Sequence, residues 1–471
     1  MKKKIEVPKK IRLRFPPSPT GLLHIGNART ILFNYLFAKK MGGETVLRIE
    51  DTDTERSKLE YVQNIIDELH WLGLDWNEGP DIGGKFGPYK QSQRTDIYKR
   101  YLEQLLAEKK AYYCNCNAEE LEAKRQDQQS RGLAPKYDGT CRDKNNTSGV
   151  IRLRVPSKKV VFVDLIRGEI ESDAGLMGDI VIARHIDSAL YHFAVVVDDY
   201  EMQISHIIRG EDHIANTPKH ILLQEALGFP KLEYAHLPLM LNADKSKMSK
   251  RAGDVAVSDY HQAGYLPEAL IKFMVLLGWN PGTEQEIFSL KELEKEFSLE
   301  KVQKSGAVFN VQKLDFMNGL YIRQKSVPAL TKLCASFLPE HNLPAKTVEK
   351  IVASCQGRMK KLSDITELAD FFLKEKLDYD TALLAWDKMN REQVKDALLL
   401  CDKILRGLEK WEVAAIQEVL EKAAGENKGQ IFWPFRIALS GKKASAPAPE
   451  IAEILGKEKT LQRIQDAIDK K

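Results

Sequence analysis

The sequence contains no long hydrophobic run. No apolar stretch among its 471 residues approaches the roughly 20 residues that a membrane-spanning helix needs. The basic start, Met1 to Lys4, is followed by Pro8-Lys9-Lys10 rather than by the apolar core of a secretion signal. We therefore expect a cytoplasmic protein without a membrane partner, and we expect it to be a monomer.

Cysteine is scarce and unevenly placed. Of the six cysteines, Cys114, Cys116 and Cys141 cluster, and the other three are scattered along segments with a helical pattern. This distribution is not that of a disulfide framework. It leaves one candidate metal site.

Charge of one sign is not in large excess either. The net charge of +4 is small for this length, so it neither requires nor excludes an anionic partner. The sequence has no internal repeat and no low-complexity segment. A chain this long is expected to form two to four domains.

The first fifty residues have the pattern of a βαβ unit. Residues 11–15 alternate as a strand does, and the proline-rich segment 16–21 ends that strand. A helical pattern opens near Gly26, and a second strand is predicted over 45–49. Such units build parallel sheets.

The rest of the chain changes character twice. Residues 111–190 combine short strand-like runs with the clustered cysteines, which is typical of an insertion. Strand and helix signals of the first kind resume around 191–197 and 204–227. From about residue 256 the pattern is helical to the end.

The segment His24-Ile25-Gly26-Asn27 lies where the first helix begins. A helix N-terminus attracts phosphate through its free N–H groups and its dipole. Gly26 would let a nucleotide approach the backbone closely, and Asn27 can donate a hydrogen bond. The alternative is a simple turn with a surface histidine, and four residues alone do not decide between the two.

A second phosphate-binding candidate is the segment Lys247-Met248-Ser249-Lys250-Arg251, which lies in a polar loop. Lys247 and Lys250, with Ser249 between them, could surround a polyphosphate and offset the charge of a departing pyrophosphate. The alternative is a solvated basic loop.

Taken together, the two motifs resemble the hallmark sequences of class I aminoacyl-tRNA synthetases. More closely, the chain is similar to the bacterial glutamyl-tRNA synthetases over essentially its whole length. One departure is Asn27, where the wider class has a second histidine. The stretches that carry the resemblance are Arg14–Gly21, Arg48–Asp53, Gly87–Arg94, Tyr191–Asp199 and Ile208–His213.

The resemblance implies a glutamate–tRNA ligase. L-Glutamate would attack ATP to give glutamyl-adenylate and pyrophosphate, and the 3′ end of tRNA(Glu) would then accept the glutamyl group. Such chemistry needs positioning and charge stabilisation more than a protein nucleophile, and Mg²⁺ is expected because ATP carries it. Two alternatives stay open: a non-discriminating enzyme that also charges tRNA(Gln), and a catalytically inactive paralogue that binds tRNA.

The resemblance also assigns residues. ATP would contact His24, Gly26, Asn27, Lys247, Ser249 and Lys250, of which His24, Lys247 and Lys250 are the catalytic candidates. A glutamate pocket must hold one ammonium and two carboxylates. Arginine can bind a carboxylate through two parallel hydrogen bonds, which lysine cannot do. The residues that match the family's pocket are Arg14, Ser18, Glu50, Tyr191, Arg209 and His213.

Two further sites are expected outside this pocket. Zinc prefers four ligands, so Cys114, Cys116 and Cys141 need one more, for which Tyr137 or Asp143 are the candidates. We expect a structural rather than a catalytic zinc. In the helical C-terminal part, Arg358 matches the position where an arginine favours glutamate anticodons, with a solvated helix arginine as the alternative.

The expected fold is an α/β Rossmann-type catalytic domain with a parallel sheet, an inserted α+β subdomain and an all-α C-terminal anticodon-binding region. The boundaries place the catalytic domain at 1–110 and 191–255, the inserted subdomain at 111–190, a helical stem-contact region at 256–325 and the anticodon-binding domain at 326–471.

Overall fold

The structure is a computed structural model that describes residues 10–246, 256–282, 285 and 288–470. It divides into two compact units. The first consists of residues 1–262 and 267–311, and the second of residues 263–266 and 312–471. Among the described residues, no helix is both long and apolar enough to span a bilayer.

The predicted βαβ unit is present. Strand β1 (Arg12–Phe15) pairs in parallel with β2 (Glu44–Leu47), and helix α1 (Ile25–Lys40) connects them. All four residues of β1 are buried, so the strand is covered on both faces. This is typical of parallel sheets, and it places Arg12 and Arg14 inside the protein rather than on its surface.

One four-stranded sheet of the first unit has the strand order β6-β5-β10-β9. Strand β10 (Glu233–Leu237) pairs in parallel with β9 (His206–Gly210) and with β5, and β6 is antiparallel to β5. A backbone hydrogen bond of 2.9 Å from Ser205 to the carbonyl of Arg12 links β1 to the start of β9. The hairpin of β5 (Lys159–Asp164) and β6 (Gly168–Asp173) comes from the segment expected as an insertion, yet it extends this sheet.

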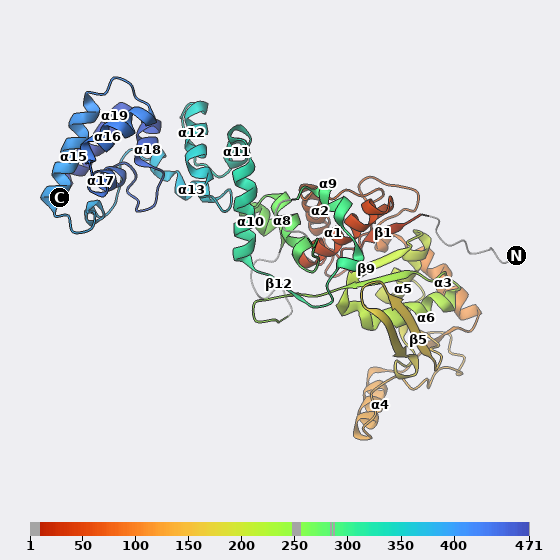
Figure 1. Cartoon of the computed structure of the whole chain (residues 1–471). Coiled ribbons are helices and arrows are strands. Elements are labelled where there is room, and N and C mark those ends of the chain that lie inside the picture. Colours follow the sequence, from red (N-terminus) through yellow and green to blue (C-terminus); the bar gives the residue numbers. More distant parts are fainter. Residues whose placement is uncertain (1–9, 247–255, 283–284, 286–287, 471) are drawn as a thin grey trace. The chain divides into compact units, whose positions relative to one another are not determined.

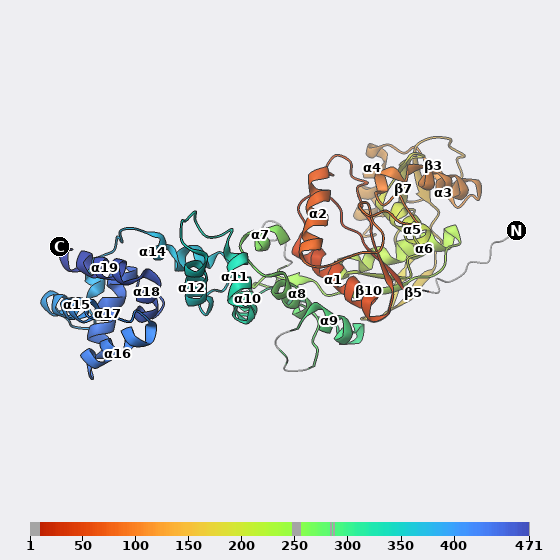
Figure 2. The ribbon, with the colours of Figure 1, turned by 90° about the horizontal axis from the view of Figure 1, so that it is seen from above.

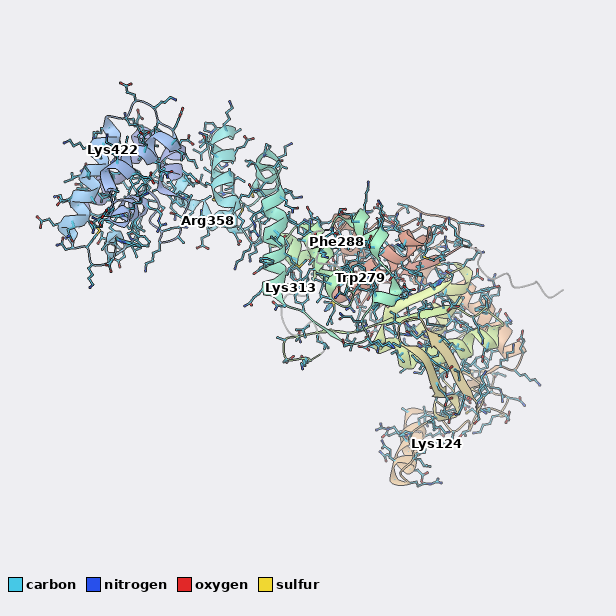
Figure 3. The ribbon with its side chains drawn as sticks, in the orientation of Figure 1. Lys124, Trp279, Phe288, Lys313, Arg358 and Lys422 are labelled. Carbon is cyan, nitrogen blue, oxygen red and sulfur yellow. The ribbon has the colours of Figure 1, made fainter. Side chains whose placement is uncertain are left out.

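The remainder of that segment forms its own antiparallel sheet, with the order β3-β4-β7-β8. Helix α4 (Ala118–Ser130) follows β3, is capped by Asn117 and buries none of its residues. Figure 1 shows α4 at the end of the first unit far from α1 and β1, and Figure 3 labels Lys124 on it. The strands are β3 (Ala111–Cys114), β4 (Val150–Leu153), β7 (Val181–His185) and β8 (Ser188–Ala189).

Helices cover the sheets of the first unit, as both ribbon views show (Figures 1 and 2). The apolar run after residue 191, which carries both strand and helix signals, forms helix α5, and its residues 193–199 are all buried. The helices are α2 (Leu59–Trp71), α3 (Thr95–Ala107), α5 (Tyr191–Glu201), α6 (Thr217–Leu227), α7 (Val257–Gln262), α8 (Pro267–Leu276) and α9 (Leu290–Glu296). A short parallel pair joins β11 (Met240–Leu241) to β12 (Ala307–Val308).

The second unit is helical throughout its described residues, as the periodic apolar pattern predicts. Its helices bury one apolar stripe each, for example Val394, Leu398, Cys401 and Leu405 of α15. The helices are α10 (Val311–Gln324), α11 (Val327–Cys334), α12 (Ala345–Gln356), α13 (Asp364–Leu368), α14 (Asp370–Leu373), α15 (Arg391–Arg406), α16 (Val413–Ala424), α17 (Lys428–Ser440), α18 (Ala448–Leu455) and α19 (Lys457–Asp469).

Candidate active site

His24 caps the N-terminus of α1. Its Nδ1 accepts a hydrogen bond of 2.9 Å from the backbone N–H of Gly26. A neutral ring with an accepting Nδ1 carries its proton on Nε2, so that nitrogen is a donor. A Cβ added at Gly26 would lie 3.1 Å from His24 Nδ1, so the glycine also leaves room for the imidazole.

A cavity of about 520 Å³ opens at this end of α1. It collects residues from β1, the proline-rich turn, α1, α5 and β9, which are far apart in the sequence. Every described residue predicted to bind ATP or glutamate lines it. These residues are Arg14, Ser18, His24, Gly26, Asn27, Glu50, Tyr191, Arg209 and His213.

A buried ion-pair network forms one wall of the cavity. Arg14 Nε lies 3.2 Å from Asp199 Oδ1, and Arg48 Nη1 lies 2.8 Å from the same oxygen. Arg48 Nη2 also lies 2.9 Å from Glu50 Oε1. Arg14 Nη1 is buried and has no hydrogen-bond partner in the described structure, so this wall retains a donor for an anionic group.

Glu50 is buried beside these arginines. Burial raises its pKa, and the charges of Arg48 and Arg14 oppose that rise. Within the described residues only Arg48 donates to Glu50, and it does so to Oε1. The second carboxylate oxygen is therefore available to an ammonium group.

Arg209 also lines the cavity, and it has no carboxylate partner among the described residues. Its nearest acidic neighbour in sequence, Glu211, instead forms an ion pair with Arg167. Arg209 donates to neutral acceptors, including the hydroxyl of Thr217 at 2.8 Å. Burial lowers its pKa. Among the described residues, Arg209 thus forms no salt bridge with the acids that follow it in sequence.

The uncharged members of the predicted pocket are neutral at pH 7. Burial raises the pKa of Tyr191 to about 12 and lowers the pKa of His213 to about 4. Ser18 is exposed in the proline-rich turn. These groups can therefore offer hydrogen bonds without adding charge.

The second phosphate motif cannot be placed in the same way, because Lys247, Ser249 and Lys250 lie outside the described residues. The described residues on either side of it do lie at the cavity. Met240 lines it, and Ala256 forms an isolated antiparallel bridge with His24.

The three clustered cysteines come together in the inserted subdomain. The Sγ atoms of Cys114, Cys116 and Cys141 all lie within 4.8 Å of one another. The Tyr137 hydroxyl lies 3.3 Å from Cys114 Sγ and 3.7 Å from Cys116 Sγ. Three sulfurs at this spacing are compatible with a tetrahedral zinc ion, whose Zn–S bonds measure about 2.3 Å.

The thiols of the cluster differ in acidity. Burial acts to raise the pKa of Cys141, but hydrogen bonding, first from Tyr137, brings it down to about 7. Burial raises the pKa of Cys116 to about 11. Asp143 is 88% exposed and pairs with Arg154 at 3.1 Å, so these contacts favour Tyr137 over Asp143 as a fourth ligand.

In the second unit, Arg358 follows α12 on the side of helices α15 to α19 (Figure 3). Its Nη2 and the Nε of Arg436 are buried without a hydrogen-bond partner in the described structure. Burial, and then the charge of Arg358, lower the pKa of Arg436. Arg436 also stacks over Trp433, with its guanidinium carbon 4.6 Å from the ring centroid. Two close arginines that have no acidic partner among the described residues form a site that can receive an anion.

The neighbouring cavity has a volume of about 560 Å³ and is lined by both tryptophan and proline side chains. Pro434 and Phe435 are buried, but Trp433 and Arg436 line this cavity together with Trp386.

Some residues in or behind the first cavity were not predicted from the sequence. Asp199 and Arg48 do not line the cavity but contact Arg14 and Glu50, which do. They lie in stretches that carry the resemblance, but nothing local indicates these contacts. Thr20, Arg29 and Asp212 line the cavity itself. Their only sequence signal is proximity to the predicted residues.

Two families of known proteins match the chain. Residues 10–316 match the catalytic domain of the class I tRNA synthetases (E and Q), and residues 329–468 match an anticodon binding domain. The fold and the cavity thus define a class I tRNA synthetase.

Individual relatives show which branch of this class the chain resembles. A glutamate–tRNA ligase of Dehalococcoides mccartyi is 42% identical over 472 residues, covering 97% of this chain and 98% of the relative. One from Halalkalibacterium halodurans is 41% identical over 483 residues, covering 98% and 99%. The crystal structure of a glutamate tRNA ligase from Elizabethkingia meningosepticum in complex with its amino acid superposes with a TM-score of 0.88 at 33% identity, covering 98% of this chain and 99% of that one. The chain therefore belongs to the glutamate–tRNA ligase family.

Proposed function

We propose that the chain is a glutamate–tRNA ligase, which uses ATP to activate L-glutamate and transfers it to the 3′ end of tRNA(Glu). The observation that carries this proposal is one cavity with two buried arginines, a buried carboxylate and the N-terminus of α1. Arg14 and Arg209 would bind the two carboxylates of glutamate, and Glu50 would bind its ammonium group.

In the activation step, the α-carboxylate of glutamate attacks the α-phosphate of ATP, and pyrophosphate leaves. The N-terminus of α1 and the Nε2–H of His24 would stabilise the phosphate charge. Lys247, Ser249 and Lys250 would act on the β- and γ-phosphates. Mg²⁺ would arrive with ATP and neutralise part of the phosphate charge.

In the transfer step, a ribose hydroxyl of the terminal adenosine of the tRNA attacks the carbonyl carbon of glutamyl-adenylate, and AMP leaves. No protein nucleophile is needed, because the adenylate is already activated. The role of the protein is to hold the hydroxyl and the carbonyl in line.

The second unit would read the anticodon. Sequence-specific recognition of RNA loops usually stacks bases on aromatic rings and arginine planes. The Arg436–Trp433 stack beside a cavity, with Arg358 close by, supports this use.

Zinc would stabilise the inserted subdomain. Cys114, Cys116 and Cys141 would hold it with Tyr137 as the fourth ligand, because the Tyr137 hydroxyl already contacts two of the sulfurs. A zinc ion bound there would tie β3 to the loop that carries Cys141.

The proposal is tested by measuring the attachment of glutamate to tRNA(Glu). The purified chain is incubated with radiolabelled glutamate, tRNA(Glu), Mg²⁺ and ATP, and acid-precipitable label is counted. Label should appear on the tRNA only with ATP, and base should release it because the ester is labile. If no label transfers, the proposed function is wrong.

A further inference from the structure

The guanidinium of Arg209 is surrounded by neutral acceptors. On β9, Arg209 is the cross-strand partner of His236 on β10, and its Nε donates to His236 Nε2 at 3.3 Å. Its Nη1 lies 3.2 Å from Nδ1 of His220, and its Nη2 donates to Thr217 Oγ1 at 2.8 Å. Arg209 is 5% exposed, and no carboxylate among the described residues lies within 4 Å of it.

These contacts determine where the protons lie. A guanidinium can only donate, so His236 Nε2 and His220 Nδ1 must accept, and both rings are neutral. His236 then donates from Nδ1 to Asp164 Oδ2 at 2.6 Å, and His220 donates from Nε2 to His192 Nδ1 at 3.0 Å. Burial lowers the pKa of both histidines, which agrees with neutral rings.

The nearby acids have other partners. Both oxygens of Asp164 are occupied, one by His236 and the other by the backbone N–H groups of Ile166 and Arg167. The imidazole of His236 therefore separates Asp164 from Arg209. Glu211 is paired with the side chain of Arg167 and accepts from the backbone of Leu239 at 2.8 Å.

We propose that His220 and His236 are positioning residues that hold Arg209 as an uncompensated cation for a carboxylate of the substrate. The proposal rests on the function proposed above, in which Arg209 binds glutamate. A carboxylate in place of either ring would hold Arg209 equally well, but it would neutralise the charge that the substrate needs. Arg14, by contrast, already shares Asp199 with Arg48. Arg209 would thus contribute much of the cavity's attraction for an anionic side chain.

The test compares His220→Asp with His220→Asn in the full-length chain. The two side chains have nearly the same shape and differ in charge. The KM for glutamate in tRNA(Glu) charging should rise at least about 30-fold in H220D, because the new carboxylate neutralises Arg209. It should rise no more than about fivefold in H220N, because the amide oxygen can still accept from Arg209. The KM for ATP should stay within about twofold in both variants, because His220 does not line the cavity and bonds to Arg209 and His192, neither of which is assigned to ATP.

Substitutions at His206, which lies on β9 together with Arg209, serve as the matched control. His206 is half-buried at the start of β9, where its Nδ1 lies 2.8 Å from Ser205 Oγ, and it does not line the cavity. H206D and H206N should have the same KM for glutamate. If H220D and H220N also share one KM while the wild type charges normally, the inference is wrong and the proposed function stands. A wild type that does not charge tRNA overturns both.

Thr217 provides a second test that introduces no charge, for the case in which H220D does not fold. Thr217→Val keeps the shape but removes the hydroxyl that accepts from Arg209 Nη2. T217V should raise the KM for glutamate about fivefold or more at unchanged kcat, and T217S should restore it, as expected for one hydrogen bond to a charged group. A KM for glutamate in T217V within about twofold of the wild type would contradict the positioning role.

Discussion

The side chains of Arg14 and Asp199 form an ion pair in the interior of the first unit, with Arg14 Nε 3.2 Å from Asp199 Oδ1 and both side chains 2% exposed. Asp199 comes from α5 and Arg14 from β1, so the pair joins two elements that are far apart in sequence. The same oxygen also receives Arg48 at 2.8 Å. Asp199 thus holds two guanidiniums at one wall of the cavity.

Removing the Asp199 charge should destabilise the protein and impair substrate binding together. Asp199→Asn leaves two buried guanidiniums without their shared partner, so the free energy of unfolding should fall by about 3–5 kcal/mol. The KM for glutamate should rise because Arg14 loses its anchor. Denaturant unfolding and charging kinetics measure the two effects. Asp53→Asn, which breaks an exposed pair with Arg56, is the control and should leave stability nearly unchanged because solvent screens such a pair.

His24→Asn should separate helix capping from catalysis. Asparagine is a favourable N-cap, so thermal stability should change little. The variant lacks the Nε2–H donor, and loss of one donor to a developing anion typically slows reaction about 10²- to 10³-fold. Charging rates at saturating ATP and glutamate measure this loss. A rate within about threefold of the wild type would show that His24 only caps the helix.

These two sites illustrate what sequence could and could not predict. The start of α1 and the place of His24 follow from a strand, a proline-rich turn and a helical period, which are local signals. Asp199 lies in an apolar run of α5, and no local pattern indicates that its partner is Arg14. Strand-like runs were also predicted within residues 111–190, and β5 is one of them, but periodicity does not reveal which sheet a strand joins. The partners of Arg209 come from α6 and β10, so only the fold brings them together.

Zinc content tests the cysteine cluster. The wild type, purified without chelator, should contain about one zinc per chain, because the three thiols and Tyr137 supply four ligands. Cys141→Ser should lose the zinc and melt at a lower temperature, as measured by elemental analysis and calorimetry. Asp143→Asn should keep its zinc, since Asp143 is exposed and paired with Arg154. A wild type without zinc after growth in zinc-rich medium would contradict the metal assignment.

Lowering the pH should reduce the free energy of unfolding, in part because the buried histidines resist protonation in the folded chain. Burial lowers the pKa of His192 and of His213 to about 4, whereas the ordinary value is 6.5. The unfolded chain therefore binds protons below pH 6.5 that the folded chain does not bind until about pH 4. The stability contributed by these residues is present above pH 6.5 and is lost as the pH falls through this window. Denaturant unfolding at pH 7 and pH 5 should show a smaller loss in His192→Asn than in the wild type. Equal losses would contradict the assigned pKa shift.

The anticodon role of Arg358 predicts a change in tRNA choice. Arg358→Gln removes one of two close arginines that have no acidic partner within the described part of the chain, so discrimination between tRNA(Glu) and tRNA(Gln) should weaken. The measurement is the ratio of kcat/KM for the two purified tRNAs, which should change about tenfold or more if one bidentate contact worth about 1–3 kcal/mol is lost. Lys422→Gln, on α16 of the same unit, is a control for charge and should leave the ratio unchanged (Figure 3). An unchanged ratio in R358Q would exclude this role.

The most direct test of the central claim identifies the product. The chain is incubated with ATP, Mg²⁺, tRNA(Glu) and all twenty amino acids together, and the terminal adenosine is released by nuclease and analysed by mass spectrometry. The account predicts glutamyl-adenosine as the one acylated species, because Arg14, Arg209 and Glu50 together match a substrate with two carboxylates and one ammonium group. Acylation by glutamine or another amino acid, or an unmodified adenosine, would contradict it.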